Sequence, residues 1–109
     1  LYMFVNGKKV VETPVVTGKV GARATPQGVY MLKNKIMDVP LVGDNYVTPV
    51  KYWMPFNGGV GIHDLTKRTA FGGDIYLTNG SHGCVNLPSS MASELYENIE
   101  AGCPILCFY

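Results

Sequence analysis

The chain has 109 residues, with nine basic and eight acidic side chains and a formal net charge of +1. This length allows one domain with one hydrophobic core, but not two. The near-neutral charge, with no run of lysine or arginine, argues against a nucleic acid or an acidic membrane surface as partner. The hydrophobic fraction of 47% excludes a disordered chain. No apolar stretch approaches the roughly 20 residues of a membrane span, so we expect no membrane contact within this domain.

The first part of the chain has the residue patterns of β-strands. β-branched and aromatic residues predict strands over Leu1–Val5 and Val10–Thr17, and Asn6 and Gly7 between them favour a two-residue hairpin turn. The sequence Thr-Pro-Gln-Gly at 25–28 predicts a tight turn with an architectural role. It leads into a predicted strand over Val29–Leu32.

The segment 34–59 is predicted as a long, irregular loop, because three prolines interrupt its short apolar runs. Aromatic side chains gather in this segment, among them Tyr46, Trp53 and Phe56. Two interpretations are open. The aromatic residues form either a wall or flap that faces a substrate or a satellite cluster of the core.

The second half returns to regular elements. Strands are predicted over Gly59–Leu65, with His63 near its end, and over Ile75–Thr78. Apolar residues that recur every four positions predict a helix over Ser90–Ala101, and a closing strand follows over Cys103–Tyr109. We therefore expect a mainly β fold with one α-helix near the C-terminus.

The three cysteines are an odd number, so at least one thiol is free or pairs with another chain. Cys103 and Cys107 are four residues apart on a predicted strand, which separates them by roughly 13 Å and puts them beyond disulfide reach. We expect both to be small buried hydrophobes. Cys84 lies instead in a glycine-rich turn.

The surroundings of Cys84 predict nucleophilic chemistry. A thiol becomes a strong nucleophile only as a thiolate, which at neutral pH needs an imidazole, a helix N-terminus or a cation nearby. His63 and His82 are the two histidines of the chain, and each is a candidate base or a structural residue. The glycines beside Cys84 let the backbone turn its amides toward an oxyanion. A zinc site of the two histidines and Cys84 lacks a fourth ligand, and we expect no metal and no cofactor.

The run Ser-His-Gly-Cys-Val-Asn at 81–86, preceded by His63, resembles the signature of the YkuD-type L,D-transpeptidases. The resemblance covers essentially all 109 residues, including the opening hairpin, the turn at 25–28, and the helix and strand that follow the signature. It implies a β-sandwich-like YkuD fold. It also implies that residues 1–109 are one L,D-transpeptidase catalytic domain, which we expect to be a fragment of a longer chain.

The resemblance implies a catalytic set of Cys84, His63, His82 and Ser81, with Asp64 orienting His63. Cys84 is the expected nucleophile, and His63 is the expected general base. The backbone carbonyl of Asp64 is expected to orient His63, and whether the Asp64 carboxylate adds to this orientation is open.

The same resemblance implies supporting roles for the rest of the signature. His82 is expected to support the site, and Ser81 to brace the loop. The backbone amides of Gly83 and Cys84 are expected to receive the oxyanion. Asn86 is expected to hold either the loop or a substrate carbonyl by hydrogen bonds.

Three aromatic residues complete the expected site. Trp53 and Phe56, with Tyr46, are expected to contact the substrate, and the first two to exclude water from the acyl-enzyme. The expected substrates are peptidoglycan stem peptides, both as donor and as acceptor. Carbapenem-type β-lactams are expected as covalent inhibitors.

The expected reaction releases D-alanine from a tetrapeptide stem and links the third residues of two stems. The alternatives are an L,D-carboxypeptidase, which uses water as acceptor, and a non-catalytic module that binds the cell wall. The resemblance implies an extracytoplasmic location, in the cell wall or periplasm, and we expect a monomer. Whether the third stem residue is lysine or diaminopimelate is open.

Overall fold

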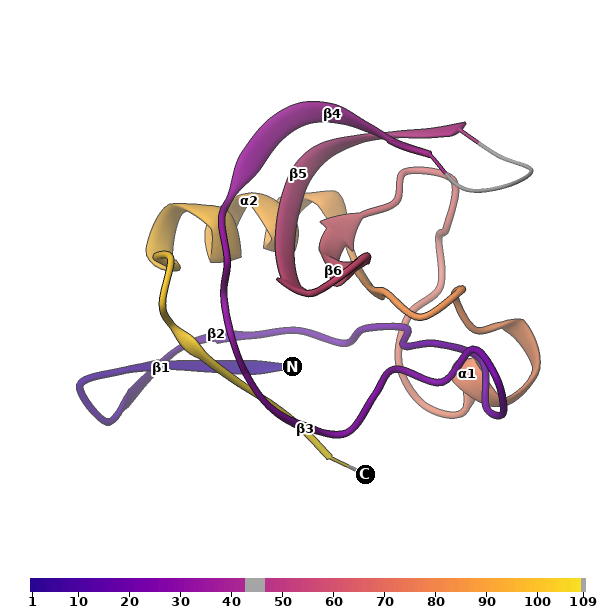
Figure 1. Cartoon of the computed structure of the whole chain (residues 1–109), viewed down its shortest axis with the longest axis horizontal. Helices are drawn as coiled ribbons and strands as arrows, with labels where there is room; N and C mark the ends of the chain where they lie inside the picture. Colours follow the sequence, from indigo (N-terminus) through magenta and orange to yellow (C-terminus); the bar gives the residue numbers. More distant parts are fainter. Residues whose placement is uncertain (43–46, 109) are drawn as a thin grey trace.

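The computed structural model describes residues 1–42 and 47–108, and strands are the main elements in this part of the chain (Figure 1). They form two two-stranded sheets and one four-stranded sheet. In chain order the elements are β1 (Tyr2–Val5), β2 (Lys8–Glu12), β3 (Gly28–Met31), β4 (Ile36–Val42), β5 (Val47–Asn57), β6 (Val60–Asp64), α1 (Ile75–Asn79), β7 (Val85–Leu87), α2 (Ser89–Asn98) and β8 (Pro104–Cys107). This arrangement confirms the mainly β fold.

The predicted hairpin at the start of the chain is confirmed. β1 and β2 are antiparallel, and Asn6 and Gly7 between them have φ values of 52° and 79°. Two consecutive positive φ values are what a type I′ turn requires. β2 ends at Glu12, five residues earlier than predicted. The closing strand is also confirmed, because β8 pairs with β3 in an antiparallel sheet.

The prediction of a loop over 34–59 is wrong, because β4 and β5 occupy most of this segment as an antiparallel pair. Pro40 of β4 lies opposite Pro49 of β5, so the two residues that lack an N–H face each other. At a non-hydrogen-bonded position such a pair removes no ladder hydrogen bond. β4 is also the edge strand of its sheet, where proline is tolerated.

The prediction of a strand over Ile75–Thr78 is also wrong, since these residues lie in the short helix α1. A short apolar run does not by itself distinguish a strand from a helix. The later helix is confirmed as α2, although it begins at Ser89 and ends at Asn98, three residues before the predicted end. Neither helix in the described ranges is long and apolar enough to span a membrane.

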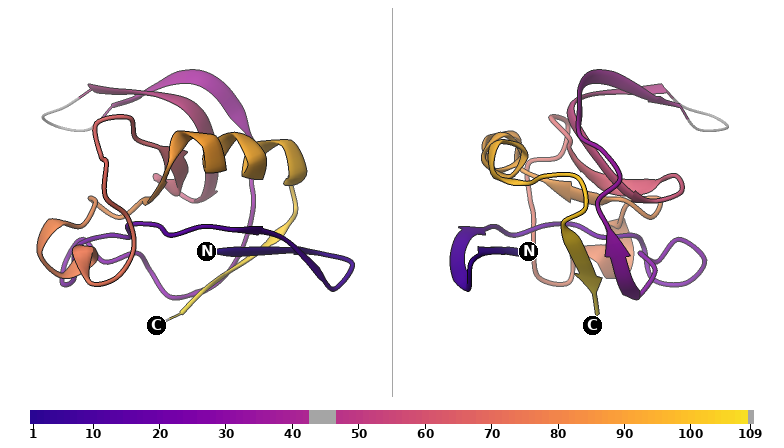
Figure 2. Two further views of the ribbon diagram at one scale, coloured as in Figure 1. Left: turned by 180° about the vertical axis from the view of Figure 1, so that it is seen from behind. Right: turned by 60° about the vertical axis from the view of Figure 1, so that its left-hand side comes forward.

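The core lies between the β1–β2 hairpin, the four-stranded sheet and α2 (Figure 2). Along β5 the burial alternates, so Tyr52, Met54 and Phe56 face this core. From α2, Ala92, Leu95 and Ile99 just beyond its end pack against the same interior, and the remaining core residues are Met3, Val11, Leu32, Ile62, Val85 and Leu87. The core thus fixes β5, β6 and β7, the strands on which the site is built.

Candidate active site

Two neighbouring parallel strands bring the predicted nucleophile and base together. β6 pairs with β7 so that His63 lies opposite Asn86. Register partners on adjacent strands point to the same face of a sheet, and side chains two residues apart share a face. Cys84 lies in the bend just before β7, where its thiol accepts a hydrogen bond from the backbone of Gly61, two residues before His63 on β6. This contact places Cys84 beside β6, near His63. On the other side of β6, Trp53 of β5 lies opposite His63, so Trp53, His63 and Asn86 form one row across the three strands.

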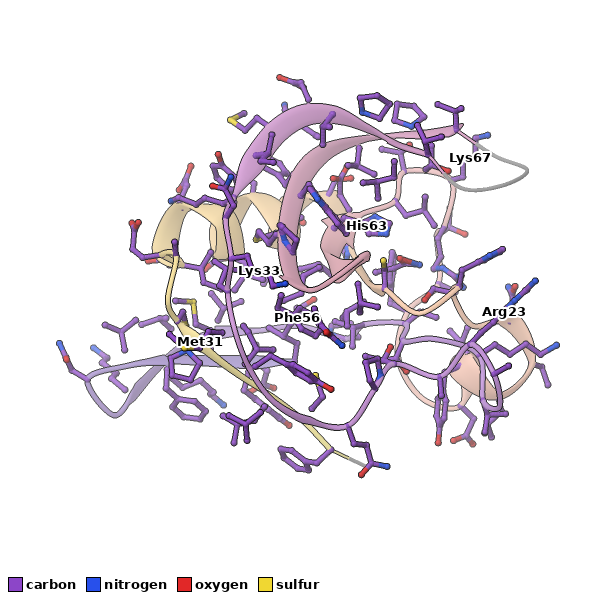
Figure 3. All side chains as sticks on the ribbon, viewed as in Figure 1. Arg23, Met31, Lys33, Phe56, His63 and Lys67 are labelled. Atoms are coloured by element: carbon purple, nitrogen blue, oxygen red, sulfur yellow. The ribbon has the colours of Figure 1, made fainter. Side chains whose placement is uncertain are left out.

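His63 (Figure 3) is buried, with 6% of its surface exposed, and its ring is held by the backbone of the next residue. Nδ1 lies 2.6 Å from the carbonyl oxygen of Asp64. A carbonyl oxygen only accepts hydrogen bonds, so Nδ1 carries the proton and Nε2 has the free lone pair. Burial lowers the pKa of His63 below its ordinary 6.5, and the bond to the Asp64 carbonyl opposes this in part. The imidazole is therefore neutral at pH 7 and able to accept a proton.

Cys84 is partly buried beside the turn that joins β5 to β6. Its Sγ donates to the carbonyl oxygen of Gly59 at 3.6 Å. Burial raises the pKa of the thiol above its ordinary 9.0, and a hydrogen bond from the backbone of Gly61 opposes this in part. Cys84 thus favours the neutral thiol near pH 7.

Gly61 makes room for this arrangement. A Cβ atom at this position would lie 2.7 Å from the Cα of Pro55 and 2.8 Å from the Cη2 atom of Trp53. Real Cβ atoms do not approach so closely, so only glycine lets the Trp53 ring lie over β6. The rings of Trp53 and His63 are 5.9 Å apart and tilted by 54°. Trp53 therefore borders the face on which the base lies.

Ser81 holds the loop that carries the nucleophile. Its Oγ makes a short hydrogen bond to the carbonyl oxygen of Cys84 and accepts one of 3.1 Å from the N–H of Gly83. This corrects the expectation that the amides of Gly83 and Cys84 both receive an oxyanion, because the Gly83 N–H is already engaged. The Cys84 N–H is the donor that the loop offers. Gly83 has a φ of 138°, a conformation that favours glycine.

The segment 16–19 clamps both ends of this loop. The backbone groups of Val16 exchange two hydrogen bonds of 2.8 Å with Asn86. At the other end, the N–H of Ser81 donates to the carbonyl oxygen of Thr17, and the N–H of Lys19 donates to the carbonyl oxygen of Ser81, each at 2.9 Å. The loop is thereby fixed to the chain on either side of Cys84.

Thr25 is a contact of this loop that the sequence pattern did not reveal. Its Oγ1 accepts a hydrogen bond of 2.9 Å from the N–H of Gly18 and donates one of 2.6 Å to the carbonyl oxygen of Gly83. Gly18 is required beside it, because a Cβ atom there would lie 1.8 Å from the carbonyl oxygen of Arg23. The tight turn predicted at 25–28 is wrong, because the turn lies at 20–23 and Gly28 already begins β3. The motif therefore gave no signal for this contact.

The Asp64 carboxylate does not orient His63. Its Oδ1 accepts hydrogen bonds of 2.9 Å from the backbone N–H groups of Lys51 and Tyr52. It therefore ties β5 to the end of β6. The backbone carbonyl of Asp64 holds the imidazole, and the carboxylate acts on it only through its charge, which raises the pKa of His63. This resolves the question that the sequence left open.

Two residues predicted to contact substrate are buried. Phe56 is 2% exposed and packs against Tyr30 with ring centroids 5.5 Å apart, so it belongs to the core (Figure 3). Strand alternation explains the difference from Trp53, which points to the other face. Asn86 is also 2% exposed, and its Oδ1 has no hydrogen-bond partner within the described residues. Its burial disfavours direct contact with a substrate, and its hydrogen bonds to Val16 are made by the backbone and not by the side chain.

The remaining predictions concern His82, Tyr46, the cysteines and a metal site. His82 is exposed on the loop next to Ser81, and its supporting role stays a prediction. Tyr46 lies outside the described residues. All three cysteines are free, so Cys103 and Cys107 do not bridge each other, as their spacing predicts. Both are half-buried, however, and not buried as predicted. Among the described residues, no group of three His, Cys, Asp or Glu side chains is suited to hold a metal ion.

Comparisons with known proteins agree with this geometry. The family model of the YkuD L,D-transpeptidase catalytic domain matches residues 1–107. The chain therefore belongs to this family. No curated protein matches the chain at a significant level.

Solved structures of L,D-transpeptidases have the same fold. A mutant L,D-transpeptidase of Enterococcus faecium is 43% identical with a TM-score of 0.93, covering 98% of this chain and 44% of that one. The catalytic domain of E. faecium L,D-transpeptidase acylated by ertapenem is 43% identical with a TM-score of 0.86, covering 98% and 87%. An L,D-transpeptidase of Stackebrandtia nassauensis is 32% identical with a TM-score of 0.80, covering 99% and 49%. This chain thus spans about half the length or less of two of these relatives.

Proposed function

We propose that this domain is a peptidoglycan L,D-transpeptidase in which Cys84 is the nucleophile and His63 the general base. The observation that carries the proposal is the hydrogen bond from His63 Nδ1 to the Asp64 carbonyl. It leaves Nε2 as the proton acceptor near Cys84, whose thiol is held beside β6 by the backbone of Gly61. Family membership supports the reaction class.

In the first half-reaction, Cys84 Sγ attacks the carbonyl carbon of the third residue of a tetrapeptide stem. A carbon–sulfur bond forms, and the thiol proton moves to Nε2 of His63. The carbonyl oxygen becomes an oxyanion that accepts a hydrogen bond from the Cys84 N–H. The bond to D-alanine then breaks, and its amine takes the proton from His63. A thioester on Cys84 remains.

In the second half-reaction, the side-chain amine of the third residue of another stem attacks the thioester. Its proton moves to Nε2 of His63, the carbon–nitrogen bond forms, and the carbon–sulfur bond breaks. The proton then returns to Cys84. Trp53 supports transfer to an amine over hydrolysis, because its ring covers part of the site beside His63.

Incubation with a disaccharide tetrapeptide, followed by mass spectrometry of the products, tests this proposal. We expect a cross-linked dimer with loss of D-alanine, and no product from Cys84→Ala. Tripeptide without dimer assigns the domain to the carboxypeptidase alternative, in which water is the acceptor. No conversion by the wild-type domain contradicts the catalytic proposal.

Two further properties follow from the substrate. A β-lactam presents a strained acyl group to the same thiol, and a relative has been described as acylated by ertapenem. We therefore propose carbapenems as covalent inhibitors of Cys84. Peptidoglycan lies outside the cytoplasmic membrane, so we propose an extracytoplasmic location.

A further inference from the structure

Thr25 is far from the signature in sequence, yet it contacts the nucleophile loop directly. It is 58 residues from Gly83, it is 4% exposed, and its hydroxyl bridges the Gly18 N–H and the Gly83 carbonyl oxygen. We propose that Thr25 is a positioning residue for acyl transfer, whose hydroxyl aims the Cys84 N–H at the developing oxyanion. This inference rests on the proposed function, because it concerns the oxyanion of that reaction.

The geometry of the peptide group carries the argument. The carbonyl of Gly83 and the N–H of Cys84 belong to one planar peptide unit, which is trans. In a trans peptide the C=O and the N–H point in opposite directions. Thr25 holds the Gly83 carbonyl oxygen at 2.6 Å on the buried side. The Cys84 N–H therefore points away from Thr25, toward the open side of the partly buried Cys84.

The rest of the loop makes this donor important. The Gly83 N–H donates to Ser81 Oγ, so it is not available to a substrate. Ser81 also holds the carbonyl of Cys84, the peptide unit on the other side of the nucleophile. Each peptide unit that flanks Cys84 is thus fixed by one hydroxyl, and Thr25 fixes the one that carries the oxyanion donor.

Without the Thr25 hydroxyl, the Gly83 peptide unit has freedom to rotate. Gly83 has a φ of 138° and lacks a Cβ atom, so its backbone meets little steric resistance to rotation. Rotation of this unit turns the Cys84 N–H away from the oxyanion but leaves Sγ and His63 in place. The loss therefore affects reactions that pass through an oxyanion and spares those that do not.

This distinction gives the experiment. Acylation of Cys84 by a carbapenem passes through an oxyanion, whereas alkylation by iodoacetamide is a displacement that forms none. Both rates are measured by peptide-resolved mass spectrometry for the wild type and Thr25→Val. Removal of an oxyanion donor typically costs about 100- to 1,000-fold in rate, and we expect misorientation to slow acylation about 10- to 100-fold. Alkylation of Cys84 should stay within about twofold of the wild-type rate.

Two further variants separate positioning from folding. Thr25→Ser keeps the hydroxyl, so we expect acylation close to the wild-type rate. Thr13→Val is the matched control: Thr13 is also 4% exposed, and its hydroxyl donates only locally, to the Pro14 carbonyl. We expect it to leave acylation unchanged. If Thr25→Val does not fold, Thr25→Ala replaces it, with the same expectation.

The outcomes decide between the two proposals. Equal acylation of Thr25→Val and wild type, or equal slowing of acylation and alkylation, overturns the role of Thr25. A wild-type domain that is alkylated but never acylated overturns the proposed function instead.

Discussion

At the scale of single residues, the resting site is an uncharged pair. Burial raises the pKa of Cys84 and lowers that of His63, so both groups favour their neutral forms near pH 7. A neutral imidazole is the form that accepts a proton, and a neutral thiol holds the proton to be accepted. We therefore expect proton transfer to accompany attack on the carbonyl and not to precede it.

The pH dependence of acylation follows from this state. Acylation needs neutral His63, so the rate falls as the pH drops through the pKa of His63. Since burial lowers that pKa, we expect the midpoint of the acidic limb below pH 6.5 and a plateau from there to above pH 9.0. The rate of carbapenem acylation measured against pH checks this. A midpoint above pH 6.5 disagrees with a buried base.

Variants of the two histidines test which of them is the general base. We expect His63→Ala to lose acylation by about 100- to 10,000-fold, the usual contribution of a general base. His82→Ala is the matched variant, because His82 is exposed and lies on the loop. Near-normal acylation in His63→Ala together with loss in His82→Ala reverses the two roles.

Trp53 is the residue whose effect should appear in the products. Its ring lies over Gly61 and beside His63, so Trp53→Ala opens the site to water. We expect a lower ratio of cross-linked to hydrolysed product and a loss of stability of about 2 kcal/mol. Trp53→Phe, which keeps an aromatic ring, should restore most of the ratio. An unchanged ratio in Trp53→Ala shows that this ring is not a barrier to water.

At the scale of the elements, the site depends on how β5, β6 and β7 are joined. Asp64 ties β5 to β6 by accepting two backbone hydrogen bonds. Asp64→Ala leaves these amides without their acceptor, and we expect it to lower the free energy of unfolding by about 2 kcal/mol or more. It keeps the backbone carbonyl that orients His63 but removes the Asp64 charge, which raises the pKa of His63, so the acidic limb of acylation should move to lower pH.

Urea unfolding and acylation of the same Asp64→Ala protein check both expectations. Asp74→Ala is the control, since Asp74 is exposed and its side chain makes no capping hydrogen bond to α1. Unchanged stability, or an acidic limb that moves to higher pH, contradicts these two roles of the Asp64 carboxylate.

The elements also show what the sequence predicts and what it does not. The hairpin at Asn6 and Gly7, helix α2 and strand β8 follow from local patterns, and the structure confirms them. β4 and β5 do not follow from local patterns, because the prolines at 40 and 49 are tolerated only through their pairing across the two strands. The prediction that Phe56 contacts substrate is wrong for the same reason. Without β5 as a strand, the sequence does not show that Phe56 lies on its buried face.

The candidate site also contains residues that the sequence predicts and contacts that it does not. In the sequence, the glycine-rich turn makes Cys84 the candidate nucleophile and leaves both His63 and His82 as candidate bases, and the family resemblance favours His63. The bonds that hold the loop are long-range, and the 58-residue separation of Thr25 from Gly83 is the clearest case. Chemistry-bearing residues are therefore predictable here, whereas their positioning partners are visible only in the fold.

At the scale of the whole molecule, the chain is a catalytic unit that covers 87% of one relative's catalytic domain but 44% of a longer relative. Its net charge of +1 provides no basic field. We therefore expect recognition of a stem peptide through shape and backbone hydrogen bonds.

The most direct test of the account is the mass of the domain after exposure to a carbapenem, with the adduct mapped to a peptide. We predict one added acyl group on Cys84 of the wild type and none on Cys84→Ala, with Cys103 and Cys107 unmodified in both. An unmodified wild-type domain, or an adduct that persists in Cys84→Ala, contradicts the claim that Cys84 is the nucleophile.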